Sequence, residues 1–300
     1  MNIGVIGLGL MGSQIASRLI STGHVVSVYN RDATKTKPFE KVDVRIANSP
    51  KELAQNSDFI IICVTDFEAI LQVSFGTEGI VDSNRKNLIV ANSSTISPNE
   101  SKYCANLFRK REIEMLGMPI MGGPSVAAKG ELVSIIAGNK EVFEKVRPTI
   151  EKLSTSVFYI GSTDGYANAV KLALNLNIAL IASAISEGVT VVKASGIDPQ
   201  IFIEILNATY FKTGLSENKG PKMVKNNFEP SFYLKDMLKD LELVTSTAQS
   251  IGVFLPLATI AQQIYRAANN SGFSQQDYTA ILAFLAKING ADNKNEIKYY

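Results

Sequence analysis

The stretch from Ile3 to Ala16, IGVIGLGLMGSQIA, decides the fold. An apolar run ends at Gly7, and Gly9 and Gly12 complete the spacing G-x-G-x-x-G where a helical pattern begins. In such a motif the first glycine permits a tight turn, the second lets a pyrophosphate approach the backbone, and the third lets the helix pack against the strand. Because the motif joins a strand pattern to a helix pattern and a second strand pattern follows, it predicts a dinucleotide-binding domain rather than a glycine-rich turn without a ligand.

Short apolar strand patterns alternate with helical patterns over the first half of the chain. Continuously apolar strands that alternate with helices are typical of a parallel sheet covered on both faces. The fold class of this half is therefore α/β, of the Rossmann type. We expect strands at 2–7, 25–29, 44–46, 59–64, 87–92, 113–117, 132–138 and 156–161, with helices such as 11–23 and 140–154 between them.

From residue 165 onward the patterns are helical. They cover 165–195, 199–209, 216–226, 233–250, 256–270 and 274–288. The segment GSTDG (161–165) supplies turn glycines and candidate N-cap residues for the first of these helices. We expect a dinucleotide-binding Rossmann domain over 1–161, an all-helical domain for substrate binding and oligomerisation over 162–290 that begins with a long interdomain helix, and a polar tail over 291–300.

The composition narrows the class of protein. Of the 300 residues 46% are apolar and 19% are charged, as in soluble globular proteins. The net charge of +2 offers no basic field for nucleic acid. The most apolar stretch, 169–185, is interrupted by Lys171, Asn175 and Asn177, which argues against a membrane span. With no signal-peptide pattern, two cysteines and one histidine, the sequence predicts a cytoplasmic protein without a metal site or a disulfide framework.

The end of the second strand pattern bears on the choice of cofactor. The sequence there is VYNRD, with Asn30 and Arg31 where an NAD site expects Asp or Glu. An arginine grips a phosphate with two parallel hydrogen bonds, which suits the 2′-phosphate of NADP. The pattern favours NADP (NADPH). NAD stays open because Asp32 follows, and Arg31 also suits stacking on the adenine.

Five motifs, in order, resemble the β-hydroxyacid dehydrogenases, the family of 3-hydroxyisobutyrate dehydrogenase and the glyoxylate/succinic semialdehyde reductases. The resemblance covers about residues 2–290. It implies an NAD(P)-dependent oxidoreductase that interconverts a small β-hydroxyacid, or another short hydroxyacid, and its semialdehyde or keto acid by hydride transfer. The motifs lie at 4–31 (beginning GVIGLGLMG), 92–98 (NSSTISP), 117–138 (beginning GMPIMGGPS), 161–175 (GSTDGYANAVKLALN) and 232–243 (FYLKDMLKDLEL).

The resemblance also implies the site residues. Lys171 is the implied catalytic proton donor and acceptor, and Asn175, one helical turn later on the same face, is the second catalytic residue. The implied cofactor-binding residues are Gly7, Leu8, Gly9, Leu10, Met11, Gly12, Asn30, Arg31, Val64, Thr65, Thr95 and Lys239. The residues implied to bind a small carboxylate substrate are Ser94, Met121, Gly122, Gly123, Lys171, Asn175 and Phe232.

Lys171 is the single charge between Asp164 and Glu187. Desolvation beside apolar surface disfavours the ammonium form of a lysine, which suits proton transfer. A helix lysine also commonly extends its ammonium group to solvent. The motif around Lys171 favours catalysis over that alternative.

Met121 departs from the family pattern, which commonly has a serine at this position. A thioether cannot donate a hydrogen bond to a substrate carboxylate. The backbone N–H groups of Gly122 and Gly123 could still hold that carboxylate, and Ser125 could replace the lost hydroxyl. The preferred substrate is therefore left open.

Other functions fit parts of the sequence. An imine reductase has a similar scaffold, which typically lacks the lysine. A 6-phosphogluconate dehydrogenase has a much longer helical domain. A non-catalytic nucleotide-binding scaffold is the alternative outside enzymes. The helix over 165–195 is apolar around most of its circumference, which one domain face cannot bury, so we expect a homodimer or homotetramer.

Overall fold

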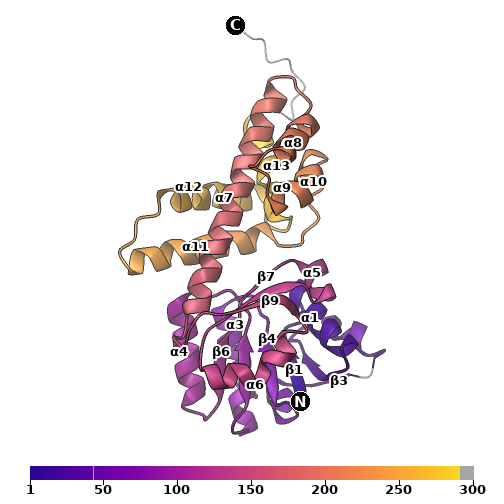
Figure 1. Cartoon of the computed structure of the whole chain (residues 1–300), viewed down its shortest axis with the longest axis vertical. Helices are drawn as coiled ribbons and strands as arrows, with labels where there is room; N and C mark the ends of the chain where they lie inside the picture. Colours follow the sequence, from indigo (N-terminus) through magenta and orange to yellow (C-terminus); the bar gives the residue numbers. More distant parts are fainter. Residues whose placement is uncertain (43, 291–300) are drawn as a thin grey trace. The chain divides into compact units, whose positions relative to one another are not determined.

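The computed structural model describes residues 1–42 and 44–290, and Figure 1 shows its elements. The chain divides into two compact units, Met1–Leu172 and the residues from Ala173 onward. We expected a boundary near residue 162, where the long helix begins. The division instead falls about two turns inside that helix, α7 (Tyr166–Ala194). The polar tail expected over 291–300 lies outside the described residues.

The N-terminal unit contains a parallel six-stranded sheet in the order β3-β2-β1-β4-β5-β6. Chain order reverses between β1 and β4, which is the topological switch point of a Rossmann fold. The expected fold class is thus confirmed. The strands are β1 (Asn2–Ile6), β2 (Val25–Tyr29), β3 (Arg45–Ile46), β4 (Phe59–Ile62), β5 (Ile89–Asn92) and β6 (Glu114–Gly117).

Both faces of this sheet are buried, because successive strand residues enter different cores. Ile3 and Val5 pack in one apolar cluster with residues of α1 and α6. Ile6 belongs to a second cluster with residues of α2, α3 and α4. The helices and short 3₁₀ turns of this unit are α1 (Leu10–Ser21), η1 (Ala33–Phe39), α2 (Pro50–Gln55), α3 (Phe67–Phe75), η2 (Ile80–Ser83), α4 (Pro98–Arg109), α5 (Pro124–Lys129) and α6 (Lys140–Ile150).

A second, three-stranded sheet holds the expected substrate segment. Its strands are β7 (Ile120–Met121), β8 (Leu132–Ile136) and β9 (Ser154–Tyr159), with β7 antiparallel to β8 and β9 parallel to it. The sequence predicts β8 and β9 but not β7, because two residues are too short to show alternation. The pairing of Met121 with Val133 fixes the backbone of the substrate segment at this point.

The unit from Ala173 onward is helical throughout the part that the structure describes. Its core includes Ile185, Val189, Ile203, Met223 and Leu282. Besides α7 it contains α8 (Pro199–Ala208), α9 (Gly214–Asn218), α10 (Gly220–Val224), α11 (Leu234–Ser250), α12 (Pro256–Ala268), the π-helical turn η3 (Asn269–Phe273), the 3₁₀ turn η4 (Tyr278–Ala280) and α13 (Ile281–Ile288).

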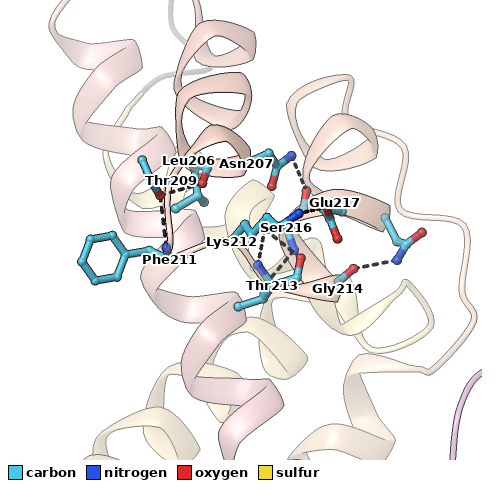
Figure 2. Close-up of polar contacts among 10 residues, drawn as sticks. Leu206, Asn207, Thr209, Phe211, Lys212, Thr213, Gly214, Ser216 and Glu217 are labelled. Atoms are coloured by element: carbon cyan, nitrogen blue, oxygen red, sulfur yellow. Dashed lines mark hydrogen bonds and ion pairs between the residues drawn. The ribbon is translucent and has the colours of Figure 1, made fainter.

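The single helix predicted over 216–226 is wrong. Two short helices, α9 and α10, meet there, because Pro221 in the first turn of α10 has no N–H to continue a helix from α9. Figure 2 shows why α9 begins early: the hydroxyl groups of Thr213 and Ser216 form a capping box with each other's backbone N–H groups. The Lys212 ammonium pairs with Glu217 at 3.1 Å beside it.

The helix predicted over 274–288 begins later, at Ile281. The preceding residues pair with the segment before α11 instead: the Asp277 N–H donates to the Phe228 carbonyl, and Asp277 forms an isolated bridge with Tyr233. The Asp277 carboxylate also accepts a hydrogen bond from the Thr279 hydroxyl at 2.8 Å, which starts η4. These long-range pairings override the local helical pattern.

The helix α7 is long and apolar enough, by length and composition alone, to cross a membrane. Its most apolar 18-residue window has a mean hydropathy of 1.6, and one third of that window is buried inside the fold. Buried helices of soluble proteins pass the same test. The polar side chains of Lys171 and Asn175 both form hydrogen bonds within the fold.

Candidate functional site

The glycine-rich loop between β1 and α1 fits a pyrophosphate. A Cβ on Gly7, which has a φ of +94°, would lie 2.2 Å from the Cys63 carbonyl oxygen, and one on Gly12 would lie 1.8 Å from the Gly7 carbonyl oxygen. Only glycine fits at these two positions. At Gly9 no described atom lies within 4 Å of an added Cβ. Gly9 is also the N-cap of α1, so the loop leaves space in front of the first N–H groups of that helix.

The side chain of Asn30 joins this loop to the end of β2. Its Oδ1 accepts a hydrogen bond from the Leu8 N–H at 2.8 Å, and its Nδ2 donates to the Asp32 carbonyl at 2.9 Å. The sequence assigns Asn30 to cofactor binding. In the structure both ends of its amide hold the polypeptide, so Asn30 shapes the loop on which a dinucleotide would lie.

The carboxylate of Asp32 is also engaged. It accepts hydrogen bonds from the Thr34 hydroxyl at 2.7 Å and the Thr34 N–H at 3.0 Å, as the N-cap of η1. These hydrogen bonds hold the pKa of the exposed Asp32 carboxyl below its ordinary value. Arg31 extends instead toward α3, where its Nη1 donates to Gln72 Oε1 at 3.2 Å. Arg31 is therefore an exposed cation just after β2, whereas the carboxylate of the neighbouring Asp32 caps the 3₁₀ turn η1.

The loops that follow β4 and β5 are linked through Ser94. Its buried hydroxyl accepts a hydrogen bond from the Val64 N–H at 3.0 Å, and its own N–H donates to Asn92 Oδ1 at 3.0 Å. Adjacent parallel strands present their carboxyl ends at the same edge of the sheet, where such folds bind their ligands. Val64, Thr65, Ser94 and Thr95 thus belong to one pair of adjoining loops.

Lys171 contacts the substrate segment. Its Nζ donates to the Ile120 carbonyl at 2.7 Å and lies 3.2 Å from the Met121 sulfur. Fifty residues separate Lys171 and Met121 in the sequence. The carbonyl acceptor and the strand pairing of β7 fix where the partly buried ammonium group lies, so it does not extend freely to solvent.

The backbone after Met121 is built from two glycines. Gly122 has a φ of +127°, and an added Cβ would lie 2.9 Å from side-chain carbons of Leu132 and Val126. Gly123 has no described atom within 4 Å of an added Cβ. The chain therefore needs glycine at 122, while glycine at 123 leaves open space beside the backbone.

Asn175 belongs to a polar cluster of the helical unit. Its Nδ2 donates to the carboxylate of Asp240, and the Lys239 ammonium lies 2.8 Å from the other oxygen of that carboxylate. Asn175 and Asp240 are 3% and 2% exposed, so Asp240 is a buried charge that these two neighbours stabilise. Asp240 is not among the residues predicted for the site, although it stands next to Lys239 in the motif at 232–243.

Phe232 lies beside Ser231, which belongs to a second ion pair with a buried carboxylate in the helical unit. The Lys219 ammonium pairs with Asp277 at 2.6 Å and donates to the Ser231 hydroxyl at 2.7 Å. The Phe232 ring meets Tyr278 edge to face, with centroids 6.0 Å apart, and burial raises the pKa of the Tyr278 phenol. No sequence pattern predicts this ion pair, because Lys219 and Asp277 are 58 residues apart.

The part of the chain that the structure describes holds no group of three His, Cys, Asp or Glu side chains placed to bind a metal ion. The buried thiol of Cys104 has its pKa raised to about 12, by burial and by Glu100, so it is protonated at neutral pH. The functional groups described above are a lysine, amides, hydroxyls and backbone N–H groups.

Comparisons with known proteins agree with this geometry. A model of the NAD binding domain of 6-phosphogluconate dehydrogenase matches residues 2–161. A model described as NAD-binding of NADP-dependent 3-hydroxyisobutyrate dehydrogenase matches residues 165–285. The solved structure of 3-hydroxyisobutyrate dehydrogenase (ygbJ) from Salmonella typhimurium has the same fold, with a TM-score of 0.88 and 24% identity, over 95% of this chain and 99% of that one.

Two relatives match along almost the whole chain. The uncharacterized oxidoreductase YfjR of Bacillus subtilis (strain 168) is 31% identical, over 94% of this chain and 99% of its own length. The chloroplastic glyoxylate/succinic semialdehyde reductase 2 of Arabidopsis thaliana is 28% identical, over 95% of this chain and 79% of its own length. The chain belongs to the β-hydroxyacid dehydrogenases, the family of NAD(P)-binding oxidoreductases that includes 3-hydroxyisobutyrate dehydrogenase.

Proposed function

We propose that this protein interconverts a small β-hydroxyacid, or another short hydroxyacid, and its semialdehyde or keto acid, with Lys171 as the group that moves the proton. The observation that carries the proposal is the contact of the Lys171 ammonium with Ile120 and Met121. These two residues directly precede Gly122 and Gly123 in the proposed substrate segment. Nicotinamide, when bound, supplies or accepts the hydride.

The proton follows a simple path in this proposal. During reduction Lys171 donates a proton from Nζ to the carbonyl oxygen of the substrate, and during oxidation it takes the hydroxyl proton back. The Ile120 carbonyl, which accepts from Nζ at 2.7 Å, orients the ammonium group between turnovers. Asn175, whose amide is held by Asp240, orients the substrate hydroxyl or carboxylate.

The substrate carboxylate would be held mainly by backbone. The N–H groups at Gly122 and Gly123 are the candidate donors, because the Met121 thioether has no proton to donate. Ser94 and Phe232 complete the proposed substrate site, as a polar group and an apolar wall. Thr95 and Lys239 are assigned to the nicotinamide end of the cofactor.

NADP is the cofactor we propose. Arg31 carries an exposed positive charge at the end of β2, and the Asp32 carboxylate is committed to Thr34. A carboxylate that accepts two hydrogen bonds from the polypeptide is less suited to a ribose 2′-hydroxyl, whereas a guanidinium suits a 2′-phosphate. Arg31→Ala is therefore expected to weaken NADPH binding far more than NADH binding.

We also propose a cytoplasmic homodimer or homotetramer that binds neither nucleic acid nor membrane. The support is the apolar surface that the helical unit leaves exposed, which includes Val191 of α7, Ile201 and Ile205 of α8, and Leu257 and Ile260 of α12. Large exposed apolar side chains on several helices are the kind of surface that a second subunit would cover.

Lys171→Ala tests the mechanism. The variant should bind NADPH with an unchanged Kd while kcat for a semialdehyde falls by about 10²- to 10⁴-fold, the usual contribution of a general acid. Lys145→Ala, an exposed lysine on α6, is the matched control and should keep full activity. Unchanged turnover in Lys171→Ala would remove the mechanism, and turnover of cyclic imines by that variant would favour an imine reductase.

A further inference from the structure

Arg31 has a neutral partner on a different element. Its Nη1 donates to Gln72 Oε1 at 3.2 Å, and the two residues are 41 positions apart in the sequence. Arg31 lies two residues after Tyr29, the last residue of β2, and Gln72 lies on the second turn of α3, the helix after β4. Strands β2 and β4 flank β1, so both residues come from the carboxyl edge of the sheet around the glycine-rich loop.

The chemical type of this partner matters. Both side chains are exposed, and an exposed arginine without a fixed partner samples many rotamers. The Gln72 carboxamide accepts one guanidinium N–H and leaves the positive charge of Arg31 uncancelled. A carboxylate at the same position would hold Arg31 more tightly but would also neutralise it and repel a phosphate.

The hydrogen bonds of the neighbouring carboxylate of Asp32 go to Thr34 rather than to the Arg31 guanidinium group. The Asp32 carboxylate accepts two hydrogen bonds from Thr34. Glu68, one turn before Gln72 on α3, is exposed, and Lys35 adds a further positive charge after Asp32. Arg31 therefore keeps its own positive charge, while Gln72 holds one edge of its guanidinium group.

We propose that Gln72 is a positioning residue for cofactor selectivity: its side-chain carbonyl orients Arg31 so that the remaining guanidinium N–H groups are aligned to bind the 2′-phosphate of NADP. This inference rests on the NADP preference proposed above. Gln72 acts through Arg31, so its effect belongs to the phosphorylated cofactor alone and depends on the guanidinium group.

Direct binding titrations of NADPH and NADH, by calorimetry or nucleotide fluorescence, test the inference on the full chain without substrate. Gln72→Ala should raise the Kd for NADPH about fivefold, in line with the loss of one hydrogen bond, and leave the Kd for NADH unchanged. Gln72→Glu should raise the Kd for NADPH more than Gln72→Ala does, because it adds a negative charge. In an Arg31→Ala background, Gln72→Ala should have no further effect on either Kd.

Gln55→Ala, at the exposed end of α2, is the matched control and should bind both nucleotides like the unchanged protein. If Arg31→Ala selectively weakens NADPH but Gln72→Ala changes neither Kd, or changes both equally, the role of Gln72 is wrong and the NADP preference stands. If Arg31→Ala weakens NADPH and NADH equally, the NADP preference itself fails, and the role of Gln72 fails with it.

Discussion

At the scale of single residues, the three glycines of the loop after β1 have different physical roles. Gly7 and Gly12 are confined by the polypeptide itself, since an added Cβ at either would overlap a backbone carbonyl oxygen. At Gly9, by contrast, no atom of the described residues lies within 4 Å of an added Cβ. A side chain at this position therefore tests the proposed binding of a pyrophosphate rather than the folding of the loop.

This difference predicts opposite outcomes for two alanine variants. Gly12→Ala should lower the free energy of unfolding by about 1–3 kcal/mol, because the backbone must shift to make room. Gly9→Ala should keep its stability but raise the Kd for NADPH by about tenfold or more, because the methyl group would meet the pyrophosphate. Thermal unfolding and nucleotide titration check the pair, and a Gly9→Ala variant that binds NADPH normally would contradict the assignment.

At the scale of elements, the ion pair between the partly buried Lys219 and the buried Asp277 organises the segment before α11. Lys219 lies between α9 and α10, and Asp277 lies just before η4. Asp277 also accepts hydrogen bonds from the N–H and hydroxyl groups of Ser231, next to Phe232. The junction of α9 and α10, the segment before α11 and the start of η4 are thus tied together by one carboxylate that is 1% exposed.

Removing the cation should be costly. Lys219→Met leaves the Asp277 carboxylate buried without its partner and should lower the free energy of unfolding by about 3 kcal/mol. Adding Asp277→Asn should restore part of that loss, since the uncompensated charge disappears. Urea unfolding followed by circular dichroism measures both, with Lys212→Met as the control, because its exposed pair with Glu217 is worth under about 1 kcal/mol. Equal losses in Lys219→Met and Lys212→Met would show that burial of Asp277 is unimportant.

The elements that could be predicted from sequence are those governed by local patterns. The strands of the Rossmann sheet and the long helices follow from apolar periodicity, to within a few residues at each end. The exceptions were decided by contacts distant in sequence or by single residues: β7 exists because it pairs with β8, the segment before Ile281 pairs with residues near Phe228, and Pro221 ends one helix and begins another.

The same distinction holds for the candidate site. Lys171, Asn175 and the glycine-rich loop belong to contiguous motifs and could be found from sequence. Three contacts could not be found from sequence: that of Asn30 with the Leu8 N–H, that of Gln72 with Arg31, and that of Asp240 with Asn175. Each depends on which residues the fold brings together.

At the scale of the whole molecule, the exposed apolar side chains of α7, α8 and α12 predict self-association. Size-exclusion chromatography with light scattering at micromolar concentration should give two or four times the 32.5 kDa of one chain. Ile205→Lys, which changes an exposed side chain of α8, should shift the protein toward the monomer without lowering its helix content. A monomer in the unchanged protein would contradict the proposed assembly.

The helix α7 has a further consequence, for how this chain can vary in evolution. It runs unbroken from Tyr166 to Ala194, and the division between the compact units falls within it. An inserted or deleted residue between Lys171 and Asn175 would rotate the later residues of α7 by about 100° around the helix axis, relative to the earlier ones. We therefore expect homologous chains to differ along this helix by substitutions, and to carry their insertions, deletions and recombination junctions in the loops on either side of it.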